Sequence, residues 1–180
     1  MIRSVLTLGG PPGSGKSTAA RAVAAALGLE YRSAGELFRA EAARRGMDLE
    51  AFGHFAETHP EVDRALDREM RTLAVPGRLV EGRVQGALCR RAGIPVIAIV
   101  VTATEDVRVA RVSGRDGHSL EETRRRLRER EASEKARYLR YYGIDLDREP
   151  ADLTVDSTSL APDGVAEAIV AFVRSREAAP

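Results

Sequence analysis

The stretch Gly10-Pro11-Pro12-Gly13-Ser14-Gly15-Lys16-Ser17 decides the fold of this chain. It matches the pattern G-x-x-x-x-G-K-[ST], in which glycines let the backbone wrap closely around a phosphate group with its N–H groups turned inward. An apolar run at 2–8 precedes the stretch, and an Ala-rich run at 16–27, which predicts a helix, follows it and ends at Gly28. A strand, a tight loop and a helix in this order predict a phosphate-binding loop.

We expect the loop from Gly10 to Thr18 to bind ATP. In a loop of this pattern the lysine, here Lys16, reaches the β- and γ-phosphates, and the hydroxyl of Ser17 ligates Mg²⁺. Lys16 is one of only two lysines among 28 basic residues, the other being Lys135. The motif therefore predicts ATP and Mg²⁺ as cofactors.

Composition limits the function classes. The chain has 180 residues, of which 43% are hydrophobic and 31% charged, and its net charge is +1. This balance does not favour nucleic acid or a membrane surface as a partner. Cys89 is the only cysteine, which excludes an internal disulfide, and the longest apolar run, 94–101, is too short to span a membrane. We expect one domain, a monomer, without a targeting segment and located in the cytoplasm.

Strands and helices alternate along the chain. Apolar runs predict strands at 2–8, 29–32, 78–81, 95–101 and 153–156, with helices between them. Alternation of this kind is typical of an α/β fold, a three-layer sandwich whose parallel five-stranded sheet carries helices on both faces. We expect the last helix at 163–174, followed by frayed residues 177–180.

Two helical stretches interrupt this alternation, at about 34–74 and about 114–145. Ligands of such sheets bind at the carboxyl ends of the strands, and both stretches are placed to cover that edge. The remaining segments, 1–33, 75–113 and 146–176, form the expected core of the single domain.

Five segments together resemble the P-loop nucleoside monophosphate kinases. They are 9–18, Ser33-Ala34-Gly35-Glu36-Leu37-Phe38-Arg39, Val80-Glu81-Gly82-Arg83, 130–138 and Tyr142-Gly143-Ile144-Asp145. The last two resemble the lid and its exit in cytidylate kinases of the compact, archaeal-type branch. Each later motif is short, but their order and spacing are specific, and the resemblance covers roughly residues 2–173.

The resemblance implies roles for individual residues. The stretch at 34–74 becomes the monophosphate-binding insert, and 114–145 the lid. The acceptor nucleotide would be bound by Ser33, Gly35, Arg39, Arg83 and Glu134. Arg111 and Arg115 would bind ATP, and Glu81 would hold Mg²⁺ through water. Arg130 and Arg137 would be catalytic lid arginines that close on the phosphates.

Transfer between two phosphates concentrates negative charge, so several arginines are expected to converge on the transferred group. Arg130, Glu134 and Arg137 lie at i, i+4 and i+7, and this spacing predicts a clamp of two arginines around one carboxylate. The alternative is an ordinary solvated face, because 121–140 is charged almost throughout. The same choice holds for Asp63 and Asp67, which either read the base or ribose or face water.

The predicted reaction is ATP-dependent phosphorylation of CMP or dCMP to CDP or dCDP. A GTPase is disfavoured, because the chain has no Asn-Lys-x-Asp motif, and the run at 95–101 does not end in the Asp of motor ATPases. One alternative is a P-loop kinase of another acceptor, such as UMP, a modified nucleotide or a small metabolite. A second is a nucleotide-gated assembly or regulatory ATPase, which would bind ATP without phosphorylating an acceptor.

Overall fold

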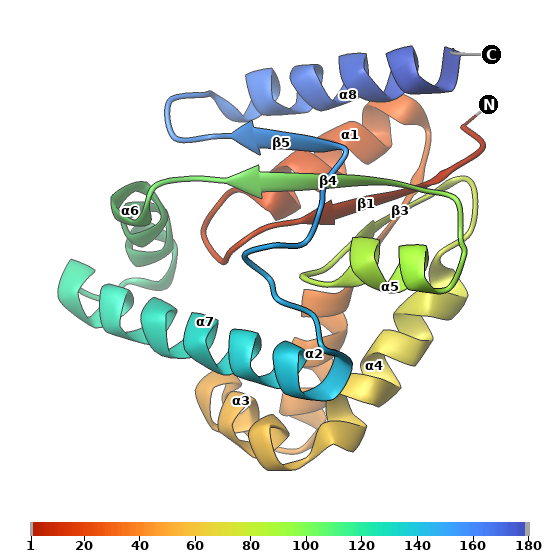
Figure 1. Cartoon of the computed structure of the whole chain (residues 1–180). Helices are drawn as coiled ribbons and strands as arrows, with labels where there is room; N and C mark the ends of the chain where they lie inside the picture. The colour runs from red at the N-terminus through yellow and green to blue at the C-terminus, as the bar shows by residue number, and fades with distance from the viewer. Residues whose placement is uncertain (1, 179–180) are drawn as a thin grey trace.

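The computed structural model describes residues 2–178 (Figure 1). Its elements are β1 (Val5–Gly9), α1 (Lys16–Leu27), β2 (Glu30–Ser33), α2 (Ala34–Arg44), α3 (Leu49–Thr58), α4 (Pro60–Leu73), β3 (Arg78–Glu81), α5 (Gln85–Arg91), β4 (Val96–Thr102), α6 (Glu105–Asp116), α7 (Leu120–Tyr142), β5 (Leu153–Asp156) and α8 (Pro162–Ala178).

The five strands form one parallel sheet in the order β2-β3-β1-β4-β5. Figure 1 shows α1 and α8 on one side of this sheet and α5 on the other. The predicted α/β fold with helices on both faces is therefore confirmed. Strand β1 lies in the middle of the sheet, so the loop that follows it opens at the centre of the strands' carboxyl edge.

Alternate residues of β1 supply two separate cores. Leu6 and Leu8 pack in the cluster shared with α1 and α8, whereas Val5 packs in the cluster that contains Met70 and Cys89. This division follows from the two-residue repeat of a strand, which sends successive side chains to opposite faces. Cys89 is a small buried core residue.

Local signals explain the helix ends. The side chain of Asp48 accepts the backbone N–H of Ala51 at 2.8 Å and caps α3. Ser119 accepts the N–H of Glu122 at 3.2 Å and caps α7, which ends at Gly143 with φ of 62°. Such caps satisfy backbone groups that the helix itself leaves unpaired.

The two ends of the chain differ from expectation. Strand β1 begins at Val5 rather than at residue 2, and α8 extends to Ala178. The predicted fraying is wrong for Glu177, because its carboxylate accepts the backbone N–H groups of Arg3 and Ser4 at 2.9 Å and 3.1 Å. Residues 179–180 lie outside the described part of the chain. None of the described helices is both long and apolar enough to cross a membrane.

Helix α7 lies against the helical segment that follows β2. Figure 1 shows α7 running beside α3, and the hydroxyl of Tyr141 donates to the carbonyl groups of Ala56 and Glu57 at 2.9 Å and 2.7 Å. At its other end α7 packs on α6 through Val109, Val112 and Leu127. Helix α7 of the expected lid therefore contacts α3 of the expected insert. The division into core, insert and lid stays a prediction.

Candidate active site

The loop between β1 and α1 is shaped by glycines at close approaches of the backbone. A Cβ at Gly10 would lie 2.1 Å from the carbonyl oxygen of Val101. A Cβ at Gly13, whose φ is 81°, would lie 2.8 Å from the carbonyl oxygen of Arg108. No larger residue fits either position without displacing the backbone, so the loop holds its phosphate-binding curve against β4 and α6.

Lys16 begins α1 and points into a site with other charges. The pKa of its ammonium group is lowered from 10.5 to about 8: burial is the main cause, Glu81 and Glu134 oppose the shift, and the cations Arg130 and Arg83 add to it. Its Nζ donates to the carbonyl oxygen of Pro11 at 3.4 Å. A buried, weakly bound ammonium beside a ring of backbone N–H groups is suited to an incoming phosphate anion.

Two oxygen groups beside the loop fit a magnesium ion. The hydroxyl of Ser17 donates to Oε1 of Glu81 at 2.8 Å, and the hydroxyl of Tyr31 donates to Oε2 of the same carboxylate. Hydroxyl and carboxylate oxygens are ligands that Mg²⁺ prefers, often with water in between. Tyr31, which the sequence did not single out, fixes the orientation of the Glu81 carboxylate.

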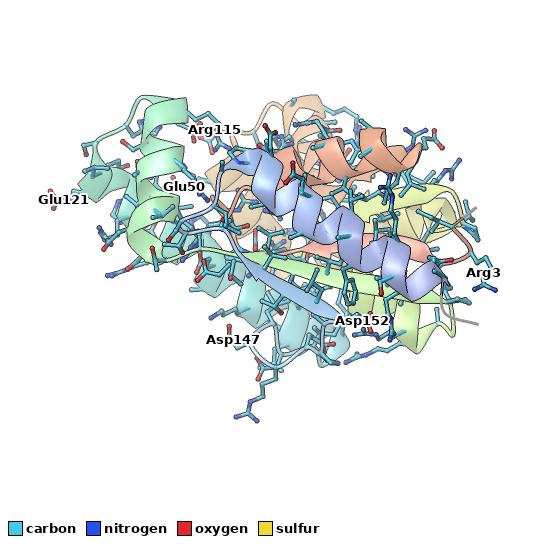
Figure 2. All side chains as sticks on the ribbon, turned by 90° about the horizontal axis from the view of Figure 1, so that it is seen from above. Arg3, Glu50, Arg115, Glu121, Asp147 and Asp152 are labelled. Atoms are coloured by element: carbon cyan, nitrogen blue, oxygen red, sulfur yellow. The ribbon has the colours of Figure 1, made fainter. Side chains whose placement is uncertain are left out.

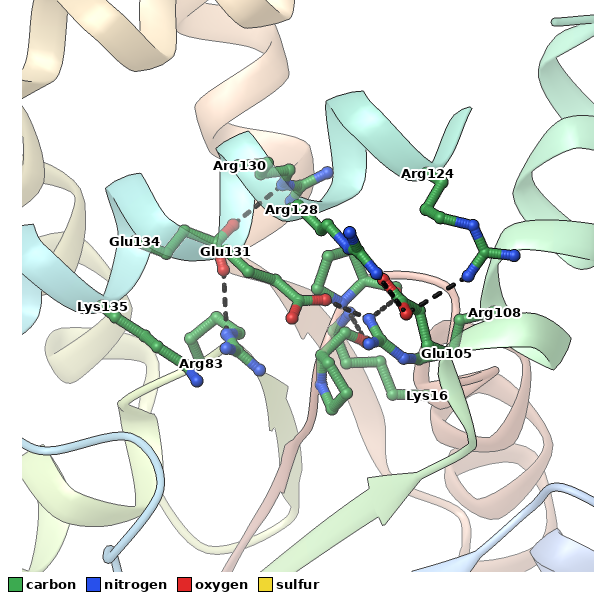
Figure 3. Close-up of polar contacts among 12 residues, drawn as sticks. Lys16, Arg83, Glu105, Arg108, Arg124, Arg128, Arg130, Glu131, Glu134 and Lys135 are labelled. Carbon is green, nitrogen blue, oxygen red and sulfur yellow. Dashed lines mark hydrogen bonds and ion pairs between the residues drawn. The ribbon is translucent and has the colours of Figure 1, made fainter. Parts of the chain in front are cut away.

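A carboxylate from α7 lies between arginines from two elements (Figure 3). Oε1 of Glu134 is 2.8 Å from Nε of Arg130, and Oε2 is 2.9 Å from Nε of Arg83, which follows β3. Glu134 is only 6% exposed. Burial alone would raise the pKa of its carboxyl, but Arg130, then Arg83 and Lys16, hold this pKa below its ordinary value. The arrangement concentrates three cations around one buried anion.

The predicted clamp is corrected in one respect. The sequence spacing placed Arg137 beside Glu134, but the guanidinium of Arg137 lies 2.9 Å from both carboxylate oxygens of Asp63 in α4. Arg83 takes the place at Glu134 instead. The reason is that Asp63 is buried at 3% exposure and supplies a second anion that helical spacing on α7 alone does not reveal. Burial raises the pKa of Asp63 to about 6, against the opposing charge of Arg137.

The solvated alternative is therefore wrong for Asp63 and Asp67, which are both buried. It holds for the first half of α7, whose charged side chains point outward, as Glu121 does in Figure 2. There Arg125 pairs with Glu122 and Glu129 within the same helix. One helix thus has a solvated half and a half that faces the site.

The two arginines expected at ATP lie differently. Arg111 contacts the phosphate loop, because its guanidinium donates to the carbonyl of Ser14 at 3.4 Å and to the hydroxyl and carbonyl of Ser157 at 2.9 Å and 2.8 Å. Arg115, labelled in Figure 2, is largely exposed and pairs with its neighbour Asp116 at 2.6 Å. The structure brings Arg111 to the loop and leaves Arg115 outside it.

Three of the residues expected to bind the acceptor nucleotide, Ser33, Gly35 and Arg39, lie at the start of α2. Ser33 caps this helix by accepting the N–H of Glu36 at 3.3 Å. The guanidinium of Arg39 folds back toward the first turn, where a Cβ at Gly35 would lie 3.4 Å from it. Arg39 is exposed, and no hydrogen bond or ion pair joins it to another residue within 2–178, which leaves its charge available to an anion.

Sequence reasoning missed Arg108, which joins the phosphate loop to α7 (Figure 3). This side chain is 9% exposed, donates to the carbonyl oxygen of Pro12 at 3.2 Å and pairs with Glu131. Arg108 lies three residues before Arg111 on the same helical face, and that spacing was the available signal.

Comparisons with known proteins agree with this geometry. A family model described as "AAA domain" matches residues 9–137. A cytidylate kinase of Archaeoglobus fulgidus is 39% identical over 175 residues, which cover 96% of this chain and 96% of that protein. A cytidylate kinase of Methanopyrus kandleri is 41% identical over 171 residues, covering 90% of this chain and 89% of that protein.

Solved structures resemble the fold at much lower identity. A shikimate kinase from Acinetobacter baumannii superposes with a TM-score of 0.65 at 20% identity, covering 99% of this chain and 97% of that chain. A gluconokinase from Sinorhizobium meliloti has a TM-score of 0.66 at 17% identity, covering 98% and 94%. These likenesses concern the architecture alone.

Proposed function

This chain belongs to the cytidylate kinase family and is an ATP-dependent nucleoside monophosphate kinase, and we propose that it transfers the γ-phosphoryl group of ATP to CMP or dCMP, giving CDP or dCDP. The observation that carries the proposal is the meeting of Lys16, Arg83 and Arg130 around Glu134. These cations come from the phosphate loop, the end of β3 and the lid, so they surround the point where donor and acceptor phosphates must meet.

On the donor side, residues 10–18 hold the phosphates of ATP and Lys16 neutralises charge on the β- and γ-groups. Arg111 contacts the loop from α6, which supports the proposal that it binds ATP. Arg115 joins the site only if its side chain leaves Asp116, a rotation that its exposed position permits.

Ser17 is proposed as a direct ligand of Mg²⁺ and Glu81 as a ligand through water, with Tyr31 holding the Glu81 carboxylate in place. When bound, Mg²⁺ would neutralise charge on the β- and γ-phosphates.

On the acceptor side, Arg39 and Arg83 hold the phosphate of the monophosphate, beside Ser33 and Gly35. An ionised phosphate oxygen is already a nucleophile, so the reaction needs orientation and charge neutralisation more than a general base. Arg39 is exposed in this structure and is expected to turn toward the bound anion.

The lid contributes Arg130 directly. Glu134 is proposed to hold the guanidinium groups of Arg83 and Arg130 in position before the phosphates bind. It is then proposed to contact the acceptor nucleotide. Arg137 holds α7 on the insert through Asp63, so a closed lid excludes water from the transferred group. We propose a monomer as the active species, which light scattering after size exclusion would test.

The function is tested by ADP release with Mg-ATP against CMP, dCMP, UMP, AMP, GMP and shikimate. We expect turnover with CMP or dCMP far above the other acceptors, and its loss in Lys16→Ala. Preferred turnover with shikimate would support a metabolite kinase instead. Tight ATP binding without turnover of any acceptor would overturn the proposal and favour a regulatory ATPase.

A further inference from the structure

A buried polar cluster between the insert and the lid has no part in the transfer described above. Asp67 lies on α4, one helical turn after Asp63, and Gln85 begins α5 with 1% of its surface exposed. Tyr142 ends α7 and reaches the same place. Burying a carboxylate and an amide is costly unless each polar atom finds a partner, so the hydrogen bonds of this cluster decide what it does.

The bonding around Asp67 fixes the direction of the Gln85 amide. Oδ1 of Asp67 accepts from Nε2 of Gln85 at 2.9 Å, and Oδ2 accepts from the Tyr142 hydroxyl at 2.8 Å. An ionised carboxylate only accepts hydrogen bonds, so the amide must turn its NH₂ group to Asp67 and its carbonyl oxygen away. This Oε1 atom is buried and has no hydrogen-bond partner within residues 2–178. The cluster therefore presents an oriented acceptor without a donor.

A matching donor lies beside the same helix face. Nε of Arg137 is buried and likewise has no partner among the described residues, although another nitrogen of its guanidinium pairs with Asp63. Because Asp63 and Asp67 lie four residues apart on α4, Arg137 and Gln85 approach one face of that helix. The guanidinium of Arg137 also lies over the ring of Phe38, 5.5 Å from its centroid.

The cluster lies beside the residues proposed to bind the acceptor phosphate. Gln85 follows Arg83 by two residues, and a Cβ at Gly82 would lie 2.8 Å from Cγ of Gln85 and 3.0 Å from Cβ of Ala34 at the start of α2. The acceptor phosphate is proposed to lie at Arg83, with ATP on the side of the phosphate loop. The nucleoside must therefore extend the other way, between α2, α4 and the end of β3.

We propose that Gln85, oriented by Asp67, distinguishes cytosine from uracil. Its carbonyl oxygen accepts from the exocyclic N4 amino group of cytosine, and the Nε–H of Arg137 donates to an acceptor on the same edge, N3 or O2. Uracil carries the acceptor O4 in place of the amino group, so O4 faces the Gln85 carbonyl oxygen, acceptor against acceptor. Uracil also carries a donor at N3, which faces the Nε–H of Arg137, donor against donor, where that group donates to N3. The inference rests on the proposed function and assigns the base specificity of that site.

Asp67→Asn tests the orientation directly. The Tyr142 hydroxyl still donates to the remaining oxygen of Asn, which turns the new NH₂ group toward Gln85. The Gln85 carbonyl must then face this donor, and its NH₂ group turns toward the base, where it suits O4 of uracil. We expect the ratio of kcat/KM for CMP over that for UMP to fall by about tenfold or more.

The matched control is Tyr142→Phe, which removes the other hydrogen bond of Asp67 and leaves the amide direction unchanged. Its CMP-to-UMP ratio should stay that of the wild type, even if the rate falls, because a loss of stability alone does not favour one base. An unchanged ratio in Asp67→Asn together with an unchanged ratio in Gln85→Met, with CMP still phosphorylated, overturns this inference and leaves the proposed function standing.

Gln85→Met keeps the side-chain length and removes the acceptor, so the test does not depend on folding of Asp67→Asn. We expect its preference for CMP over UMP to fall by about tenfold. A preference equal to that of the wild type would overturn the inference. Absence of CMP turnover in the wild-type enzyme would instead overturn the proposed function, and this inference with it.

Discussion

Arg83 and Glu134 form an ion pair, with 2.9 Å between Nε and Oε2, that joins the carboxyl edge of the sheet to the lid. The other oxygen of Glu134 pairs with Arg130, and Lys16 lies in the same field. The carboxylate of Glu134 is the anion that these three cations share, a role that we expect substrate phosphates to take over. Replacing Glu134 would therefore leave buried positive charge that a bound phosphate is expected to offset.

Glu134→Gln is expected to destabilise the protein without nucleotide, because it leaves buried cations without an anion at a cost of about 3–5 kcal/mol. ATP should recover more of that loss than it adds to the wild type, since its phosphates supply the missing charge. Thermal unfolding with and without ATP measures both effects. Glu129→Gln, on the exposed half of α7, is the control and should change little. Equal unfolding temperatures for Glu134→Gln and wild type would contradict the expectation.

The pKa of Lys16, lowered by burial to about 8, predicts how ATP binding depends on pH. The charged form that attracts phosphate is present below this pKa and is lost above it, so affinity for ATP should weaken as the pH rises through about 8. Calorimetric titration of the free enzyme on either side of this pH measures the change. Lys16→Arg removes the titration, so any remaining alkaline loss in that variant would place it on another group.

The same shift has a consequence for stability. The unfolded lysine has a pKa of 10.5, so between about pH 8 and 10.5 the unfolded chain binds more protons at this position than the folded protein. Since stability rises with pH wherever the unfolded state binds more protons, Lys16 contributes a rise in the free energy of unfolding across this window.

The phosphate loop was predictable because its signal is local. The residues Gly10 to Ser17 carry the turn, the close approaches and the ligands in one stretch, and the helix after it ends at Gly28 as the sequence indicates. The ends of α7 likewise carry local signals, because Ser119 caps its first turn and Gly143 follows its last residue with a left-handed backbone. Patterns within one element need no knowledge of what the element packs against.

Partners across elements were not predictable in the same way. Helical spacing groups both Arg130 and Arg137 with Glu134, and Arg130 does pair with it, but the second partner is Arg83, which is distant in sequence. Asp63 and Asp67 look like part of a solvated face, and only their burial under α7 shows otherwise. From sequence alone, a charged residue is expected to face solvent, because charged residues are rarely buried without a partner. A partner from a distant part of the chain is known only once the tertiary structure is known.

The Asp63–Arg137 pair is expected to hold the lid helix on the insert. Asp63→Leu leaves the Arg137 charge buried without an anion, so the free energy of unfolding should fall by about 3–5 kcal/mol. The double variant Asp63→Leu with Arg137→Met removes both charges and should recover a large part of that loss. Urea unfolding of the two single variants and the double variant gives the coupling energy. Additive losses would show that the pair does not act as a unit.

Arg108 is expected to couple the phosphate loop to lid closure. It holds the carbonyl of Pro12 and the carboxylate of Glu131 at once, so a closed α7 and a correctly shaped loop support each other. Arg108→Ala should loosen both, which lowers kcat/KM for ATP and raises the share of ATP hydrolysed without an acceptor, because an incompletely closed lid admits water. Arg108→Lys should recover little, since an ammonium sits on a shorter side chain and is more strongly hydrated than a guanidinium, so it is costlier to bury in this contact.

Two measurements separate this coupling from general damage. Hydrogen exchange of the loop amides reports its order, and ADP release with and without CMP reports the hydrolytic share. The control is Arg128→Ala, which removes an arginine of α7 whose ion pair with Glu105 of α6 is exposed. It should change neither the exchange of the loop amides nor the hydrolytic share. If Arg108→Ala exchanged its loop amides as slowly as the wild type and hydrolysed no more ATP, the contact would be structural packing only. Faster exchange confined to the loop, together with a larger share of ATP hydrolysed without an acceptor, would instead show that Arg108 couples the order of the loop to the position of α7.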